Sequence, residues 1–218
     1  MNKIYLIILS IALVLFISSC QEVFDPGATE AESYAGDWYY GVYGGEGDLQ
    51  YPIDALYSYE SPLLTYNTSS NTSNEIWVDD QDLYWGLKAK VTVTGDAMSF
   101  SSGEGINLSY VAEPEAPASG GVTIKDTIDD YAIFKIDEAK IMTGAATVWA
   151  DREHAPADSI YMKFTFYPAV FTYVSKEIDT ESTGKKIILE RTGYEILPDW
   201  SDTYIIQGHR QTGWEVEF

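Results

Sequence analysis

The chain contains little cysteine, histidine or positive charge. Its 218 residues include one cysteine and two histidines, and 34 acidic residues outnumber 13 basic ones, which gives a formal net charge of -21. A single cysteine excludes a disulfide within the chain, and two separated histidines argue against a transition-metal site. The acidic excess repels phosphate backbones and anionic headgroups. We therefore predict no metal, no cofactor and no nucleic-acid partner.

Recognisable catalytic signatures are also missing. The nucleophile elbow Gly-x-Ser-x-Gly is absent, and only His154 and His209 could supply an imidazole base. No pair of acidic residues has a spacing that singles it out for glycoside hydrolysis. The run Asp79-Asp80-Gln81-Asp82 lacks the glycine and closing glutamate of a calcium loop, which favours a solvated hairpin turn. We therefore name no catalytic residue and favour a binding protein over an enzyme.

One apolar run stands at the N-terminus, from Ile4 to Ile17, directly after the single positive charge of Lys3. The run is shorter than the roughly 20 apolar residues that a membrane-spanning helix needs, and small residues follow it. We interpret residues 1–19 as a secretory signal peptide. The alternative is a membrane helix that remains on the mature protein.

The end of this run, Ile17-Ser18-Ser19-Cys20, resembles the lipobox of bacterial lipoproteins. The resemblance implies cleavage before Cys20 and lipidation of its thiol, which would anchor the protein to the outer membrane, on the cell surface or on the periplasmic face. Residues 20–33 lack periodicity and contain the turn signal Asp25-Pro26-Gly27, so we expect a flexible tether. Residues 34–218 are then one folded domain.

Within that domain, apolar residues recur with a period of two. Trp85, Leu87, Ala89, Val91 and Val93 alternate with mostly polar neighbours, and residues 160–166 repeat the pattern. This alternation is typical of strands with one buried face. Further strands are expected at 37–43, 63–67, 75–78, 97–100, 106–111, 122–125, 131–136, 140–149, 187–190 and 203–207. No segment forms a convincing amphipathic helix, although residues 50–60 could hold a short helix or lid.

Many short strands separated by turn signals indicate an all-β fold, which we predict to be an antiparallel up-and-down barrel of the lipocalin or calycin type. A β-sandwich is the structural alternative. The choice matters for function because a barrel of about eight strands has an interior just wide enough for side chains or for one small ligand.

Gly36-Asp37-Trp38 resembles the Gly-x-Trp signature of lipocalins and other calycins. In those proteins the tryptophan closes the base of the barrel, and an arginine near the last strand packs across its ring. Arg210 stands in the corresponding place here. The resemblance therefore implies that Gly36, Trp38 and Arg210 close the barrel, with a cation-π contact of about 0.5–2 kcal/mol.

A longer series of motifs covers most of the domain and resembles a family of Bacteroidetes lipoproteins, the lipid-binding putative hydrolases with a lipocalin-like fold. The motifs are Gly36-Asp37-Trp38-Tyr39, Leu64-Thr65-Tyr66-Asn67-Thr68, Asn74-Glu75-Ile76-Trp77-Val78-Asp79-Asp80, Trp85 with Lys88 and Lys90, Asp158-Ser159-Ile160-Tyr161 and Arg210-Gln211-Thr212-Gly213-Trp214. The resemblance implies a hydrophobic ligand. The stretch 176–198 is longer than the family pattern.

The apolar faces of the predicted strands give the candidate ligand site. We expect it to be lined by Trp85, Leu87, Val91, Phe134, Met162, Phe164 and Phe166. These side chains either surround a small cavity for a fatty acid or lipid, or fill the barrel completely. We predict a lipid-anchored cell-envelope protein that binds a small hydrophobic ligand. The alternatives are a surface protein that binds glycans or proteins, and a hydrolase; the oligomeric state stays open.

Overall fold

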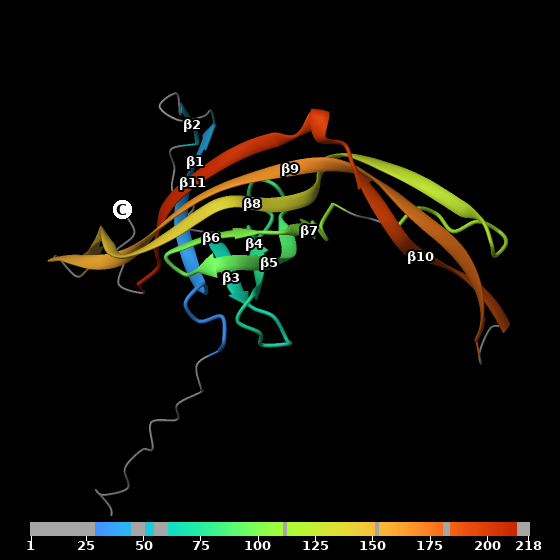
Figure 1. Ribbon diagram of the computed structural model, residues 1–218, viewed down its shortest axis with the longest axis horizontal. Helices are drawn as coiled ribbons and strands as arrows, with labels where there is room; N and C mark the ends of the chain where they lie inside the picture. The colour runs from blue at the N-terminus through green and yellow to red at the C-terminus, as the bar shows by residue number, and fades with distance from the viewer. Residues whose placement is uncertain are drawn as a thin grey trace, which may run out of the picture.

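The computed structural model describes residues 29–44, 51–54, 61–110, 113–150, 153–180 and 184–212, and these residues are almost entirely β-structure (Figure 1). The strands are β1 (Gly36–Gly44), β2 (Tyr51–Asp54), β3 (Leu63–Asn67), β4 (Glu75–Asp79), β5 (Lys88–Asp96), β6 (Ser99–Ser102), β7 (Glu104–Ile106), β8 (Thr123–Ala150), β9 (Glu153–Thr180), β10 (Gly184–Ile196) and β11 (Asp202–Arg210); a 3-10 turn, η2, spans Pro198–Trp200. Cys20, the predicted signal peptide and most of the predicted tether lie outside the described residues.

Eight strands form a closed antiparallel barrel. Each pairs with the next in the order β1, β3, β4, β5, β6, β8, β9 and β11, and β11 pairs with β1 again. The last contact sets Trp38 opposite Arg210. Because successive strands of these eight are neighbours in the sheet, the predicted up-and-down barrel is confirmed. In the segment that could have held a helix, residues 51–54 form strand β2 beside β1.

The period of two follows from this architecture. Along β5, Ala89, Val91 and Val93 are buried, whereas the neighbouring Lys88 and Lys90 are exposed. Alternate side chains of a strand point to opposite faces, so one set enters the barrel and the other meets water. Burial of each large apolar side chain contributes about 1.5–3 kcal/mol.

Strands β8 and β9 are much longer than the sequence pattern predicts. Each runs for 28 residues, and β8 joins three segments that we expected to be separate strands. Their pairing shifts register between Ile128 and Ile133, between Ile136 and Glu138, and between Met142 and Ala146. These irregularities interrupt the alternation of buried and exposed side chains although the strand continues.

The extra length of these strands extends the same sheet beyond the barrel, and we call this extension the wing: Thr123–Ile128 of β8, Ala169–Thr180 of β9, and β10. The wing arches away from the barrel on the right of Figure 1. It has its own buried cluster, built from Ala132, Ile133, Ala169, Phe171 and Tyr173. The stretch that is long for the family pattern, 176–198, therefore forms part of β9 and the whole of β10.

No helix among the described residues is long and apolar enough to cross a membrane.

Candidate functional site

The three residues predicted to close the barrel lie together where the first and last strands meet. The guanidinium carbon of Arg210 stands 4.8 Å from the centre of the Trp38 ring. The Trp38 indole Nε1 donates a hydrogen bond to Thr65 Oγ1 at 2.8 Å, and Thr65 Oγ1 donates to the backbone oxygen of Tyr34 at 2.6 Å. A Cβ on residue 36 would lie 2.9 Å from the Trp38 ring, so only glycine fits there. These contacts tie the first strand to the last strand and to Thr65 of β3.

Asp158 ties this closure to the β8–β9 hairpin, a role that the sequence did not reveal. Its Oδ2 lies 3.5 Å from Arg210 Nε, and its Oδ1 accepts a hydrogen bond from the Gly144 backbone at 3.0 Å. Gly144 stands in the bulge between Met142 and Ala146, with a φ of 63°. Asp158 begins one of the family motifs, which was the available signal. Its carboxylate orients the arginine and holds the bulge.

Gly208 is required by the close approach of β11 to β1. A Cβ at this position would lie 2.1 Å from the backbone oxygen of Tyr39. We therefore expect Gly208→Ala to lower the free energy of unfolding by about 1–3 kcal/mol, the usual cost of overpacking. Urea unfolding measures the change. Gly193→Ala is the matched control, because a Cβ there meets no atom within 4 Å; equal losses in the two variants would contradict this interpretation.

The predicted ligand residues all lie in one buried cluster inside the barrel. Trp85, Leu87, Val91, Phe134, Met162, Phe164 and Phe166 belong to it, and none is more than 3% exposed. The Trp85 ring centre is 5.0 Å from that of Phe164 and 5.9 Å from that of Phe166. Phe134 lies 5.5 Å from both phenylalanines. Aromatic rings therefore fill the space around Trp85, and a ligand there must displace some of them.

Three half-buried tyrosines, Tyr84, Tyr131 and Tyr204, pack on this cluster and were missed by the sequence analysis. The Tyr84 and Tyr204 ring centres each lie 5.4 Å from that of Trp85, and the Tyr131 and Tyr204 hydroxyls are 3.2 Å apart. Tyr204 lies near the start of β11 and Arg210 ends it. The three tyrosines therefore lie at the end of the barrel opposite Trp38 and Arg210, and we call this end the tyrosine end.

Burial raises the pKa of Tyr204 above its ordinary value of 10.0, and the hydrogen bond with Tyr131 raises it further. Since the pKa is higher in the folded state, the resulting stability is complete below pH 10 and is lost as pH rises toward the folded value. We expect the free energy of unfolding to fall more steeply above pH 10 in the wild type than in Tyr204→Phe. Urea unfolding at several alkaline pH values, alongside tyrosinate absorbance, checks this; parallel curves would refute it.

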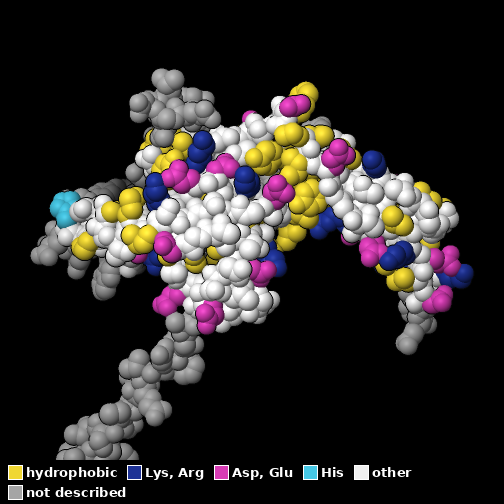
Figure 2. All heavy atoms as spheres, in the orientation of Figure 1, with side chains coloured by type: hydrophobic (Ala, Val, Ile, Leu, Met, Phe, Trp, Pro, Cys, Tyr) yellow, Lys and Arg dark blue, Asp and Glu magenta, His cyan; other side chains and the backbone are white. Residues whose placement is uncertain are grey.

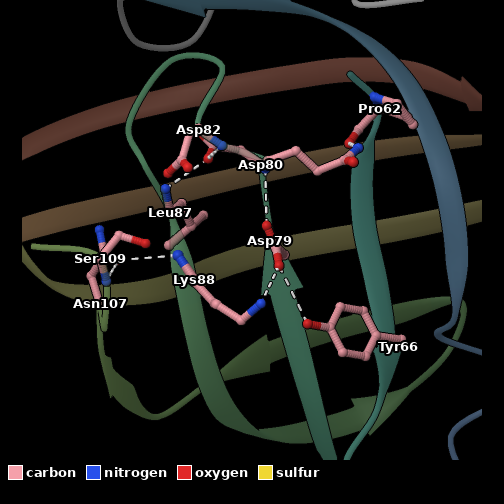
Figure 3. A network of polar contacts seen from close by, with 10 residues as sticks. Pro62, Tyr66, Asp79, Asp80, Asp82, Leu87, Lys88, Asn107 and Ser109 are labelled. Carbon is pink, nitrogen blue, oxygen red and sulfur yellow. Dashed lines mark hydrogen bonds and ion pairs between the residues drawn. The ribbon is translucent and has the colours of Figure 1, made fainter. Parts of the chain in front are cut away.

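Asp80 holds the loop that carries Trp85 (Figure 3). Its side chain is fully buried and accepts backbone hydrogen bonds from Trp85 and Leu87, both at 2.7 Å. It also accepts from Asp82 at 3.1 Å and from Tyr84 at 3.3 Å. Burial raises the pKa of Asp80 and the four N–H donors offset part of that rise. The prediction of a solvated hairpin turn for this acidic run is therefore wrong at Asp80, whose buried carboxylate holds the backbone of Trp85.

A hollow of about 740 Å³ lies on the outside of the barrel, lined in part by Lys140, Tyr161, Ser159 and His209. Ser159 and His209 stand opposite each other on β9 and β11, and the ring of His209 meets Tyr39 edge-on. His154 lies elsewhere, opposite Trp149 in the exposed hairpin. Within the described part of the chain, no group of three or more His, Cys, Asp and Glu side chains could hold a metal ion.

Comparison with known proteins identifies the family of the chain. The family model described as lipid-binding putative hydrolase matches residues 24–215. No curated protein matches the chain significantly. The family and the barrel together support the binding of a lipid or similar hydrophobic ligand. Because the match spans nearly the whole chain, this protein belongs to the lipid-binding putative hydrolase family.

Proposed function

We propose that this protein is a lipid-anchored cell-envelope protein that binds one small hydrophobic ligand, a fatty acid or the acyl chain of a lipid, at the tyrosine end of the barrel. The observation that carries the proposal is the position of Trp85. Its ring lies between a floor of Phe164 and Phe166 and a cover of Tyr84 and Tyr204. An apolar floor beneath a few polar groups is the usual form of a small-molecule site.

We expect the ligand to enter at the tyrosine end, because Arg210 packs over the Trp38 ring at the opposite end. The Tyr131 and Tyr204 hydroxyls bond each other at 3.2 Å, and both tyrosines are only half-buried. When these two rings turn outward, their hydroxyls become donors for a carboxylate headgroup. Trp85 and Phe166 then meet the acyl chain. In this proposal the ligand reaches the apolar cluster as the two tyrosine rings turn.

Fluorescence titration with palmitate tests this site. We expect the tryptophan emission to change in the wild type and most of that change to be lost in Trp85→Phe. Trp200→Phe is the matched control, because Trp200 is 76% exposed and does not belong to the buried cluster. An unchanged emission in the wild type, together with no palmitate retained in native mass spectrometry, would reject the proposal.

Membrane anchoring through Cys20 completes the proposal. The lipobox-like Ile17-Ser18-Ser19-Cys20 supports it, and so does the formal charge of -21, which opposes binding to anionic membranes through the protein surface. Three acyl chains on the mature cysteine would exceed the two that stable anchoring requires. Expression in a bacterial host with labelled palmitate should label the wild type and leave Cys20→Ala unlabelled. Label on both proteins would remove Cys20 from the proposal.

Hydrolysis is a second candidate, favoured by the register that sets Ser159 opposite His209 on the rim of one hollow. In this arrangement His209 would act as the base and Ser159 as the nucleophile toward an ester. A panel of acyl esters should then be turned over by the wild type and not by Ser159→Ala. Absence of turnover in the wild type would leave binding as the function of the fold.

A further inference from the structure

A second groove, separate from the tyrosine end, runs between the outer wall of the barrel and the wing. It has a volume of about 430 Å³. The barrel side contributes Trp77 of β4 and Leu108 after β7, and the wing side contributes Arg191 and Tyr194 of β10. Figure 1 shows β10 leaving the barrel beside β7, and Figure 2 shows hydrophobic side chains gathered where barrel and wing meet. None of the predicted ligand residues lines this groove.

Both walls of this barrel–wing groove carry an aromatic ring that packs against a second ring on the adjacent strand. Trp77 stacks on Tyr66 with ring centres 6.5 Å apart and an angle of 23° between the planes. The ring centre of Tyr194 lies 5.8 Å from that of Phe171, and Tyr194 is 38% exposed; Leu108 on the barrel side is 47% exposed. Rings fixed in this way lose little conformational freedom when a ligand stacks on them.

The charged side chains in the groove balance one another. Lys90 pairs with Glu75 at 3.4 Å, and Arg191 lies over the Phe171 ring at 5.6 Å. Glu104 faces Tyr194 from the barrel side: burial raises the pKa of Tyr194 first, and the charge of Glu104 raises it further. Two cations and two carboxylates thus line a site with no net charge. The chain as a whole carries -21, which disfavours an anionic ligand.

We propose that the barrel–wing groove binds a neutral oligosaccharide. A sugar ring offers an apolar C–H face to Trp77 and Tyr194 and hydroxyl groups to Arg191, Glu75 and Glu104. An acyl chain is less suitable, because it would remove these charged groups from water and offer them no hydrogen bond in return. A charged peptide is also less suitable, because the groove offers no excess charge of either sign. The inference goes beyond lipid binding and uses different residues.

Affinity electrophoresis through gels that contain neutral polysaccharides (β-glucan, xylan, mannan or starch) tests the proposal. We expect at least one of them to retard the wild type, and we expect both Trp77→Ala and Tyr194→Ala to weaken that binding by about tenfold or more. Trp200→Ala is the matched control, because Trp200 is exposed and outside the groove, and it should bind like the wild type. Circular dichroism of each variant verifies folding.

Three results would overturn the inference: no neutral polysaccharide retards the wild type, acidic pectin or a peptide library binds in preference, or Trp200→Ala weakens binding as much as Tyr194→Ala. If Trp77→Ala fails to fold, Tyr194→Ala alone decides, since its ring lies on the wing surface. Palmitate binding is read from Trp85 in a separate titration. Failure of the glycan groove and failure of the lipid site are therefore distinguishable.

Discussion

Replacing Trp38 with alanine is expected to lower the free energy of unfolding by about 3–5 kcal/mol, the range for removal of a fully buried large aromatic side chain. Trp38 is 0% exposed and joins three parts of the fold. Its ring packs under Arg210 and against the backbone at Gly36, and its indole nitrogen bonds Thr65. The variant therefore loses a cluster contact, a hydrogen bond and the closure between β1 and β11 together.

Urea unfolding of Trp38→Ala, Arg210→Ala and Trp200→Ala separates these contributions. Arg210→Ala should lose less than Trp38→Ala, because the cation-π contact contributes about 0.5–2 kcal/mol and the Asp158 contact is partly exposed. Trp200→Ala should change the stability by at most about 0.5 kcal/mol, since its side chain is 76% exposed. A Trp38→Ala protein as stable as the wild type would show that the barrel does not depend on this closure.

Replacing Asp80 with alanine is expected to cost about 3 kcal/mol or more. Two effects oppose each other at this residue. Burial disfavours the Asp80 carboxylate, as its raised pKa indicates, and alanine removes that penalty. Alanine also leaves the buried N–H groups of Trp85 and Leu87 without acceptors, at about 1–3 kcal/mol each, and weakens those of Asp82 and Tyr84. The loss of four acceptor contacts outweighs the gain.

The same variant should also weaken palmitate binding, because the freed loop no longer holds Trp85 against the phenylalanine floor. Urea unfolding and the fluorescence titration measure the two effects on one sample. Asp82→Asn is the control, since Asp82 is exposed and asparagine tolerates its positive φ of 61°. Equal stability of Asp80→Ala and Asp82→Asn would contradict the role assigned to the Asp80 carboxylate.

Local patterns in the sequence were sufficient for several strands, and the resemblance to calycins favoured a barrel over a sandwich. Alternation along Lys88–Val93 identified a strand with one buried face, and the expected strand 63–67 agrees residue for residue with β3. The meeting of Trp38 with Arg210 came from resemblance to calycins, since the 171 intervening residues carry no signal of that pairing. The interior set around Trp85 followed from the same alternation once the fold was assumed.

The remaining features depend on long-range geometry. The bulges in β8, one of which contains Tyr131 with a φ of 47°, interrupt the alternation and hid a single long strand. Tyr204 contacts Trp85 because β11 pairs with β9, a long-range pairing. Asp80 lies in an acidic run typical of a surface turn, and only the structure shows that its carboxylate accepts four backbone N–H groups. The groove lies between Trp77 on the barrel and Tyr194 on the wing. The sequence indicated the wing only through the length of the stretch 176–198.

The central claim, that a lipid binds beside Trp85 at the tyrosine end, is tested most directly by photo-crosslinking. A diazirine-bearing palmitate should label the protein, and peptide mapping should place the label on Trp85, Phe166, Tyr131 or Tyr204. Excess palmitate should compete the label away. Label confined to the outer surface of the barrel or to the wing, or label that palmitate does not compete, would contradict the claim.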